Sequence, residues 1–457
     1  MKRTSGIAAA LAVLFCAHTA LAAVSAEEAA RLGADLTPVG AEKAGNAAGT
    51  IPAWDGGLTA PPPGITIDPA KHLPDPFAAD QSLYTVTAAN MAQYESTLPD
   101  GHKEMLKAYP DSYFMKVYPS RRSCAYPQMV YDAIKGNAVT AQIIDDGYSV
   151  TGTKMSSPFP IPKSAQEILW NHELRYQGYK VVRESAEATP TKSGDYTITV
   201  STDNQIYRYA NPALAKIEDL NNEYFFFFKQ IISPSSAAGS MIVLLNLLDQ
   251  KDEGRRVWRY APGERKVKRA MGIGYDAVTS TSEGIRTSDN MMGLYNGAQD
   301  RYDWELLGKQ EELIPYNTFA LSSPDLKYKD LLHQQHLNQD PIRYELHRTW
   351  VVEGKLKAGK VHAIVARRRL YVDEDTWSVV ATALYGADGK IARVQEGHMD
   401  NYYDQPLCEL GSDVIYDIGG GRYNVLRLGN EQKLINFNAA LDEADFSPSG
   451  IRRIGVR

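Results

Sequence analysis

The sequence of 457 residues is poor in three things: cysteine, excess positive charge and recognisable catalytic motifs. It contains no H-E-x-x-H metal motif, no G-x-S-x-G nucleophile elbow and no phosphate-binding loop. Its formal net charge of -6 lacks the basic excess that nucleic-acid binding requires. These absences favour binding or transport over catalysis, and we expect no enzyme activity, cofactor, metal or nucleic-acid partner.

The first residues have the pattern of an export signal. Lys2 and Arg3 precede an apolar stretch at 7–15, which is too short to span a bilayer as a permanent helix. A small-x-small cleavage signal ends at Ala22. We therefore predict a signal peptide at 1–22 and a periplasmic mature protein that can associate with the outer membrane.

Two cysteines, Cys124 and Cys408, remain after removal of that segment. An oxidising periplasm favours a disulfide between them, and the alternative is two small buried thiols. In the chain-entropy model a disulfide closing so long a loop would stabilise the fold by about 4–6 kcal/mol. The pairing depends on geometry, so the sequence leaves both alternatives open.

The mature chain divides into an arm and one domain. Residues 23–76 are rich in Pro, Gly and Ala and include Pro-Pro-Pro-Gly at 61–64. Turn signals and few bulky apolar residues indicate an extended arm without a core of its own. The composition is even after residue 77, which favours a single α+β domain over 77–457.

Short helices and many strands are expected in that domain. Two capping boxes, Ser25-x-x-Glu28 and Ser164-x-x-Glu167, predict helices that begin at residues 26 and 165. Other apolar patterns predict helices at 87–98 and 102–109, and strands at 113–118, 139–144, 179–184, 196–202, 224–232, 241–248, 257–260, 343–352, 361–372, 378–385 and 391–395. Short turns between the later strands indicate antiparallel pairing, because parallel strands need long crossovers.

Two of these strands, 224–232 and 241–248, are apolar at both parities. Such strands are covered on both faces of a sheet. In a curved sheet one cover would be helices and the other a ligand-holding interior, whereas in a sandwich both covers would be protein. If the interior holds a ligand, we expect its apolar contacts to be Phe225, Phe227, Met241, Val243 and Leu245, or the opposite parity of the same strands.

The segment GRRVWRYAPGERKVKRAMGIGY at 254–275 predicts a complete β-hairpin. Period-2 alternation places Trp258 and Tyr260 on one face, at the wall of the expected cavity. The helix predicted at 165–176 carries Trp170, which either docks this helix on the core or marks a lid near the cavity mouth. A W-x-Y-x-P-G hairpin resembles a recurring unit of periplasmic lipoprotein carriers.

The same hairpin concentrates positive charge in an otherwise acidic chain. A run of charge is usually a solvated face, but it would also serve as a docking patch for anionic headgroups or an acidic partner. The residues expected to form this patch are Arg255, Arg256, Arg259, Arg265, Lys266, Lys268 and Arg269.

Several long blocks together resemble one protein family. They include LTPVGAEKAGNAAGTIPAWDGG at 36–57, PFPIPKSAQEILWNHELRYQG at 158–178, NGAQDRYDWELLGKQEELIPYN at 296–317 and RYELHRTWVVEGKLKAGKVH at 343–362. The pattern is similar to domain-of-unknown-function 1329, a family of exported proteobacterial proteins. A more distant similarity to outer-membrane lipoprotein-sorting proteins implies a LolA/LolB-like fold, a half-open β-barrel closed by short helices. The resemblance also implies association with envelope transport systems, but it assigns no catalytic residues.

Two other groups contain residue types that can bind metals or act in catalysis. His333 and His336 have a spacing at which they could share a metal, but the polar stretch around them favours a solvated helix face. The carboxylates of Asp373, Glu374 and Asp375 lie in a predicted hairpin turn, where acidic residues are ordinary. We expect neither group to be a site.

The sequence thus predicts a periplasmic binding or carrier protein for a hydrophobic or lipid-like molecule, serving an envelope transport system. The alternative is a non-catalytic interaction subunit of an outer-membrane or envelope assembly.

Overall fold

One sheet of 15 strands organises the computed structural model, which describes residues 24–251, 253–270, 274–279 and 281–455. Strands β3 (Gln142–Ile144) and β4 (Ser149–Thr151) form a separate pair. The strands of the large sheet are β1 (Tyr84–Val86), β2 (Met115–Val117), β5 (Lys180–Ala188), β6 (Ile198–Tyr207), β7 (Glu223–Ser233), β8 (Met241–Leu247), β9 (Arg255–Ala261), β10 (Lys266–Arg269), β11 (Tyr302–Pro315), β12 (Arg343–Leu356), β13 (Arg367–Asp373), β14 (Val379–Tyr385), β15 (Ile391–Tyr402), β16 (Leu407–Asp417) and β17 (Arg422–Leu428).

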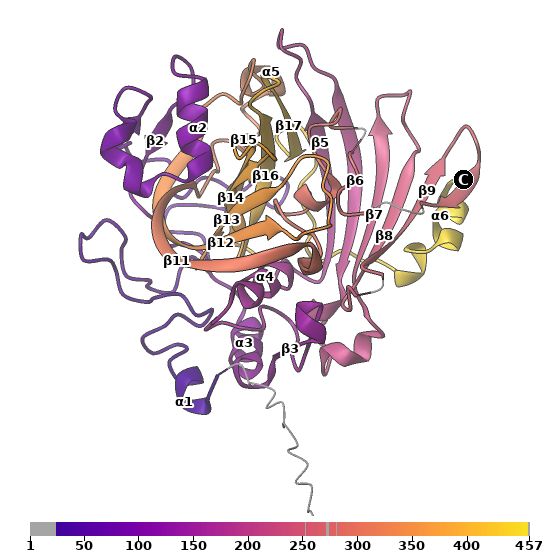
Figure 1. Ribbon diagram of the computed structural model, residues 1–457, viewed down its shortest axis with the longest axis horizontal. Coiled ribbons are helices and arrows are strands. Elements are labelled where there is room, and N and C mark those ends of the chain that lie inside the picture. Colours follow the sequence, from indigo (N-terminus) through magenta and orange to yellow (C-terminus); the bar gives the residue numbers. More distant parts are fainter. Residues whose placement is uncertain (1–23, 252, 271–273, 280, 456–457) are drawn as a thin grey trace, which may run out of the picture.

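The sheet does not close on itself in the described residues. Its order is β1-β2-β12-β13-β14-β15-β16-β17-β5-β6-β7-β8-β9-β10, with β11 paired to β12 outside this path. All these pairings are antiparallel except the short one between β2 and β12. Figure 1 shows β11 and β12 curving round one end, while β5 to β9 fan out side by side at the other. The predicted fold class, an α+β incomplete barrel built on a large antiparallel sheet, is confirmed.

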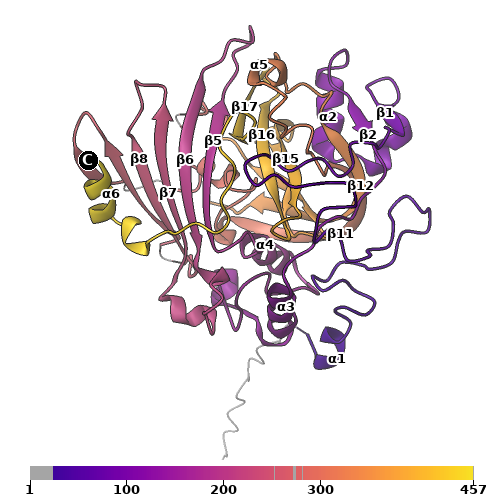
Figure 2. The same ribbon diagram turned by 180° about the vertical axis from the view of Figure 1, so that it is seen from behind.

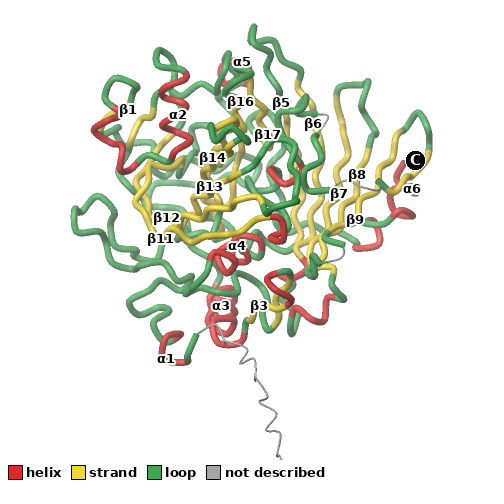
Figure 3. The backbone as a smooth tube through the Cα atoms, viewed as in Figure 1, coloured by secondary structure: helices red, strands yellow, loops and turns green. Residues whose placement is uncertain are grey.

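Helices are short (Figure 3). Both predicted capping boxes are formed, at Ser25–Glu28 and at Ser164–Glu167. The α-helices are α1 (Ala26–Ala29), α2 (Asp100–Ala108), α3 (Gln128–Thr140), α4 (Ala165–Glu173), α5 (Tyr328–Leu331) and α6 (Pro448–Gly455), and the 3-10 helices are η1 (Met91–Thr97), η2 (Asp145–Gly147), η3 (Arg208–Ala210), η4 (Ile217–Leu220), η5 (Ser288–Asn290), η6 (Gln299–Arg301) and η7 (Glu443–Asp445). Helix α3 replaces the first part of the strand expected at 139–144.

Different helices cover the two faces of the sheet. Helix α4 buries Trp170 in one core cluster with Phe225 and Phe227 of β7, and we call this side the α4 face. Helix α6 buries Ile451 against Val243 on the opposite side, which we call the α6 face. Strands β7 and β8 therefore have buried apolar residues on both faces.

The N-terminal segment before β1 wraps over the molecule. Residues 30–83 form no helix or strand, and Figure 2 shows them as an indigo chain passing in front of the orange strands. The Trp54 indole N–H donates to the carbonyl of Cys124 at 3.2 Å. Cys124 in turn is joined to Cys408 in β16 by a disulfide, which is the first of the two alternatives left open by the sequence. Arm and sheet are thus tied together near one point.

No helix in the described part of the chain is long and apolar enough to cross a membrane. The signal peptide expected at 1–22 lies outside the described residues.

Helix α2 is fixed to the sheet through a buried carboxylate. Glu396 in β15 lies 2.8 Å from His102 Nε2 and accepts hydrogen bonds from the hydroxyls of Tyr113, Tyr344 and Tyr416 at 2.7–3.0 Å. Burial alone would raise the pKa of Glu396, but the hydrogen bonds and the nearby imidazole outweigh it and lower the pKa to about 2.

This carboxylate makes stability depend on acid pH. Because the folded-state pKa lies below the ordinary value of 4.5, the contribution is present above about pH 4.5 and is lost as the pH falls toward 2. We expect Glu396→Gln to lower the free energy of unfolding by roughly 3 kcal/mol at pH 7 and by almost nothing near pH 2. Urea unfolding at several pH values measures this difference, and a constant difference across the range would contradict it.

Candidate ligand-binding site

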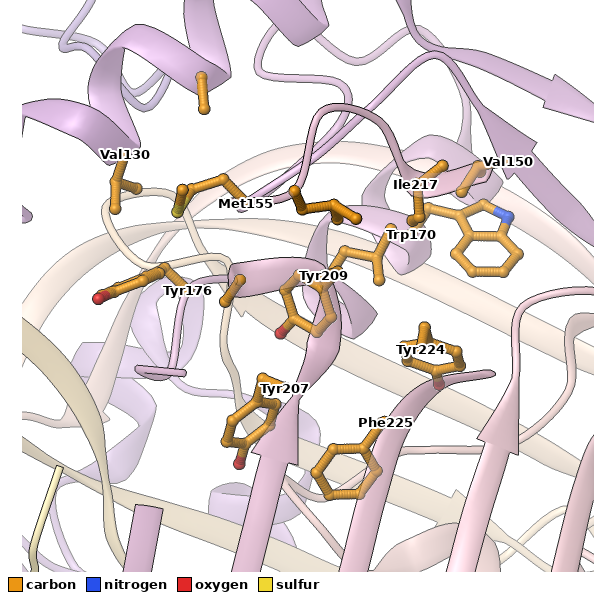
Figure 4. Close-up of a cluster of buried hydrophobic side chains, with 14 of the residues drawn as sticks. Val130, Val150, Met155, Trp170, Tyr176, Tyr207, Tyr209, Ile217, Tyr224 and Phe225 are labelled. Atoms are coloured by element: carbon orange, nitrogen blue, oxygen red, sulfur yellow. The ribbon is translucent and has the colours of Figure 1, made fainter. Parts of the chain in front are cut away.

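The α4 face of β6 and β7 carries an aromatic row. Register pairs Tyr207 with Phe225, whose rings lie 4.9 Å apart, and Phe227 follows at 6.4 Å from Phe225. Figure 4 shows Tyr207, Tyr209, Tyr224 and Phe225 gathered on this side. Phe225 and Phe227, both predicted as ligand contacts, line a small hollow here, which we call the inner cavity.

The other predicted strand contacts lie on the opposite face. Antiparallel register places Val243 opposite Phe228 on one side and Trp258 on the other, and Met241 opposite Tyr260. These side chains, together with that of Leu245, pack beneath the C-terminal segment. The prediction that Met241, Val243, Leu245, Trp258 and Tyr260 share one cavity with Phe225 and Phe227 is therefore wrong, because they have opposite parity once the strands are in register.

Trp170 does not stand at a cavity mouth. It is fully buried, and its indole N–H donates to the carbonyl of Gly147 at 3.1 Å. Figure 4 shows it beside Val150 and Ile217. It docks helix α4 on the core, the first of the two roles considered for it.

The cover of the α6 face was not predicted. The Phe446 ring lies 5.9 Å from Phe226 and 6.4 Å from Phe228, and Ile451 is fully buried beside them. Tyr260 donates to the carbonyl of Gly455 at 2.7 Å. Ile451 and Ile454 have the i, i+3 spacing of a helix face, and these residues with the preceding Phe446 could have indicated this cover.

The inner cavity is small, and its lining mixes aromatic and charged side chains. Its volume is about 80 Å³, room for a few water molecules but well below that of ordinary ligand pockets. Beyond the aromatic row, the strands present Ser185, Glu187, Asp203 and Lys229 to it. Glu173 at the end of α4 accepts a hydrogen bond from Tyr224, and burial raises the pKa of this carboxyl. An acyl chain does not fit such a place.

A much larger hollow lies beneath the N-terminal arm. This arm groove has a volume of about 1120 Å³. Arm residues 67–75 form one wall, and the other walls come from the loop at 319–325, the end of β15 with the turn after it, and the segment 429–438. The arm is held at one end by Tyr403, whose hydroxyl donates to the carbonyl of Pro74 at 2.9 Å. The apolar part of the lining includes Leu73, Pro74, Phe319, Tyr402, Ile435 and Phe437.

A β-bulge places Arg427 where its side chain lines both the inner cavity and the arm groove. The pairing of β17 with β5 shifts register between Val425 and Leu428, and Arg427 within this shift has a φ of 68°. Such a left-handed conformation is unusual for a residue with a side chain, and bulges often redirect side chains next to sites. Arg427 lines the inner cavity and the arm groove and holds Glu409 at 2.7 Å.

Arg183 in β5 lies next to it, in the wall of the arm groove. Only 3% of this residue is exposed, and its guanidinium donates to the carbonyls of Leu410 and Gly411 at 3.4 and 3.3 Å. Its Nε has no partner among the described residues. Burial, and then the neighbouring Arg427 cation, lower the pKa of Arg183. Neither arginine was singled out by the sequence.

The predicted docking patch is smaller than expected. Arg255 is half-buried and turns inward, donating to Ser288 and Asn296 at 2.8–2.9 Å and stacking on Tyr275. Arg256 is bound by Glu223 and Glu253. The remaining five basic residues are exposed on β9, β10 and their turn, although Glu264 and Glu253 pair with two of them: Arg259, Arg265, Lys266, Lys268 and Arg269.

The carboxylates of the 373–375 turn are buried rather than solvated. Burial, with the nearby Asp375, raises the pKa of Asp373 to about 7. One ligand atom each from His347, Asp373 and Asp375 lies within 4.8 Å of the others, so these residues could hold a metal. Arg122, however, binds Asp375 at 2.7 and 2.9 Å, and Glu345 lies 3.0 Å from His347 Nε2. The groups already neutralise one another, which favours a structural ion network.

His336 also differs from the expected solvated helix face. It is buried, and its ring nitrogens lie 2.8 Å from the Ser112 hydroxyl and 2.7 Å from the carbonyl of Leu337. These contacts satisfy the imidazole without a metal.

Residues 85–452 match the family described as Protein of unknown function (DUF1329). The chain belongs to this family. The uncharacterized protein PA3922 of Pseudomonas aeruginosa is 42% identical over 98% of this chain and 97% of its own length. A crystal structure of a DUF1329 family protein from Desulfovibrio piger covers 60% of this chain and 92% of its own, with a TM-score of 0.42 and 13% identity. A LolA superfamily protein from Nitrosomonas europaea covers 62% and 98%, with a TM-score of 0.37 and 14% identity.

The C-terminal cover makes a prediction about stability. Phe446→Ala should lower the free energy of unfolding by roughly 3–5 kcal/mol, because it empties an aromatic site between Phe226 and Phe228. Ile232→Ala, at an exposed position of the same strand β7, is the matched control and should change it by less than about 0.5 kcal/mol. Urea unfolding compares the two variants, and equal losses would show that the C-terminal segment is not a structural cover.

Proposed function

We propose that this DUF1329 protein binds and carries a hydrophobic, lipid-like molecule in the cell envelope, and that the arm groove is its binding site. The size of this groove supports the proposal, since about 1120 Å³ suits a molecule with a long apolar chain. Its apolar walls would remove that chain from water at about 25 cal/mol per Å² buried.

The arm gives the groove a cover that can open without disturbing the sheet. Residues 67–75 form no helix or strand, so no ladder of backbone hydrogen bonds would break if they moved. Loading and release would then require a displacement of the arm alone.

The proposal predicts the effect of a charge in the groove. Phe437 packs edge-on against Tyr402, with ring centres 4.9 Å apart, and contributes to the apolar wall. Phe437→Glu should weaken binding of the fluorescent probe dansyl-undecanoic acid at least about tenfold, because a carboxylate at the wall disfavours an apolar chain. Val361→Glu, at a position 74% exposed and outside the groove, should bind as the wild type does. Fluorescence titration, with circular dichroism to check folding, decides between them.

The exposed basic residues of the hairpin formed by β9 and β10 favour the binding of anionic partners. Arg259, Arg265 and Lys266 have no carboxylate within 4 Å among the described residues. We propose that this surface brings the carrier to anionic membranes for loading or release. The second candidate function, a non-catalytic interaction subunit of an envelope assembly, would use the same surface for an acidic protein.

Charge removal tests this surface. Replacing Arg259, Arg265, Lys266 and Lys268 with Gln should weaken binding to phosphatidylglycerol vesicles at least about tenfold at low salt, and the wild-type binding should fade at high salt. The control replaces Lys327, Lys329, Lys355 and Lys360, which are exposed elsewhere. Sedimentation with vesicles measures both. Equal losses would indicate net charge alone, and no wild-type binding would favour the interaction-subunit function.

A further inference from the structure

We infer that Arg183 and Arg427 form the head-group end of the arm groove, and that the ligand is an amphiphile with an anionic head, a carboxylate or a phosphate. The inference rests on the proposed function and names the class of molecule bound. Its apolar chain would lie along Phe319, Ile435 and Phe437.

The first support is a buried cation without a counter-ion. Asp203 is the cross-strand neighbour of Arg183, yet the Asp203 carboxylate lies 3.9 Å from Lys229. The guanidinium instead makes two long hydrogen bonds to backbone carbonyls, and its Nε is unpartnered within the described chain. No carboxylate of those residues lies within 4 Å of it. Leaving a charge so deep and unpaired is costly, and an anion entering the groove would remove the cost.

The second support is the bulge that places Arg427. This residue adopts a left-handed backbone conformation, and its Nε is also without a partner in the part of the chain that the structure describes. Of the acids near the two arginines, Glu409 is bound to Arg427 at 2.7 Å. Asp400 accepts hydrogen bonds from Ser322 and Thr318 at 2.5 and 2.9 Å. Both acids interact electrostatically with Arg183, but neither lies within 4 Å of its guanidinium, so among the described residues its Nε remains free to donate to an anion.

The chemistry of guanidinium fits this role. Its planar N–H groups bind carboxylate and phosphate oxygens in pairs, and these charge-assisted hydrogen bonds strengthen where water is excluded. Apolar side chains line the same groove as the two arginines. A molecule with one anionic end and one apolar end would therefore contact both the arginines and the apolar wall. A neutral lipid would leave Arg183 unpaired, and a free inorganic anion would leave the apolar wall empty.

The test compares one tail with two heads. Dansyl-undecanoic acid and its methyl ester are titrated into the full-length protein and into Arg183→Met, Arg183→Lys and Lys433→Met. Lys433 is a cation at the groove rim with 81% of its side chain exposed, and it is the matched control. We expect Arg183→Met to weaken the acid about 10- to 100-fold and the ester hardly at all. Arg183→Lys should lie between, and Lys433→Met should resemble the wild type.

A second measurement separates this role from a structural one. If Arg183 waits for a ligand, Arg183→Met removes an unpaired buried charge and should leave the thermal midpoint of the free protein unchanged or higher. Loss of stability together with equal weakening of acid and ester would make Arg183 a structural residue and overturn the inference.

The remaining outcomes distinguish the sources of the anion and the two levels of the proposal. Inorganic phosphate at millimolar concentration should not displace the acid. Displacement by phosphate alone would indicate a free-anion site and overturn the amphiphile. Wild-type protein that binds acid and ester equally would refute the head-group site but leave the carrier function standing, whereas protein that binds neither would refute the proposed function itself.

Discussion

The constraint on which this structure depends is that a sheet apolar on both faces must be covered twice. Strands β7 and β8 place Phe226, Phe228 and Val243 on one side of the sheet and Phe225 and Phe227 on the other, and all five side chains are buried. The C-terminal segment covers the first side and helix α4 with its surroundings covers the second. With protein on both faces, the middle of the sheet is a core, and the site proposed for a ligand lies where the covering layers separate. That place is the boundary between β17, β5 and the N-terminal arm.

The bulge in β17 is the local cause of that separation. Strand β17 meets β5 only near Ala186 and Ala188, whereas the first part of β5 faces the later segment at Asn436 and Asn438. The chain between Gly429 and Leu434, which joins these two pairings, lines the arm groove opposite arm residues 67–75. The disulfide between Cys124 and Cys408, together with the hydrogen bond from Trp54 to Cys124, holds the arm against the sheet close to this opening. Site geometry thus follows from a single register shift and the tether beside it.

Sequence patterns predicted the architecture better than the site, for identifiable reasons. Period-2 alternation and turn residues located the hairpin at 257–269, and the capping boxes located α1 and α4, because these signals are local. Strand β16 was not predicted, since its Glu409, Gly411 and Asp413 read as a polar break although all three are buried. Val243 and Phe227 could not be assigned to faces, because the face depends on register between strands. No local sequence pattern identifies Arg183 as a site residue. The role proposed for it depends on the absence, among the described residues, of a carboxylate within 4 Å, which is known only from the fold.

The charged residues on the α4 face indicate how a ligand would be oriented in the proposed carrier. The inner cavity has room for only a few water molecules and presents Glu187, Asp203 and Lys229 beside its aromatic residues. In the proposed carrier, the apolar part of a ligand would therefore lie in the arm groove and only its polar end would approach the inner cavity. Arg427 lines both spaces and Arg183 stands beside it. A head group bound there would meet two cations on the protein side, while its chain remained beneath a movable arm on the solvent side. The ligand would then enter from solvent, with its apolar tail in the arm groove and its head group against the sheet. This orientation leaves the fewest charged groups without a partner.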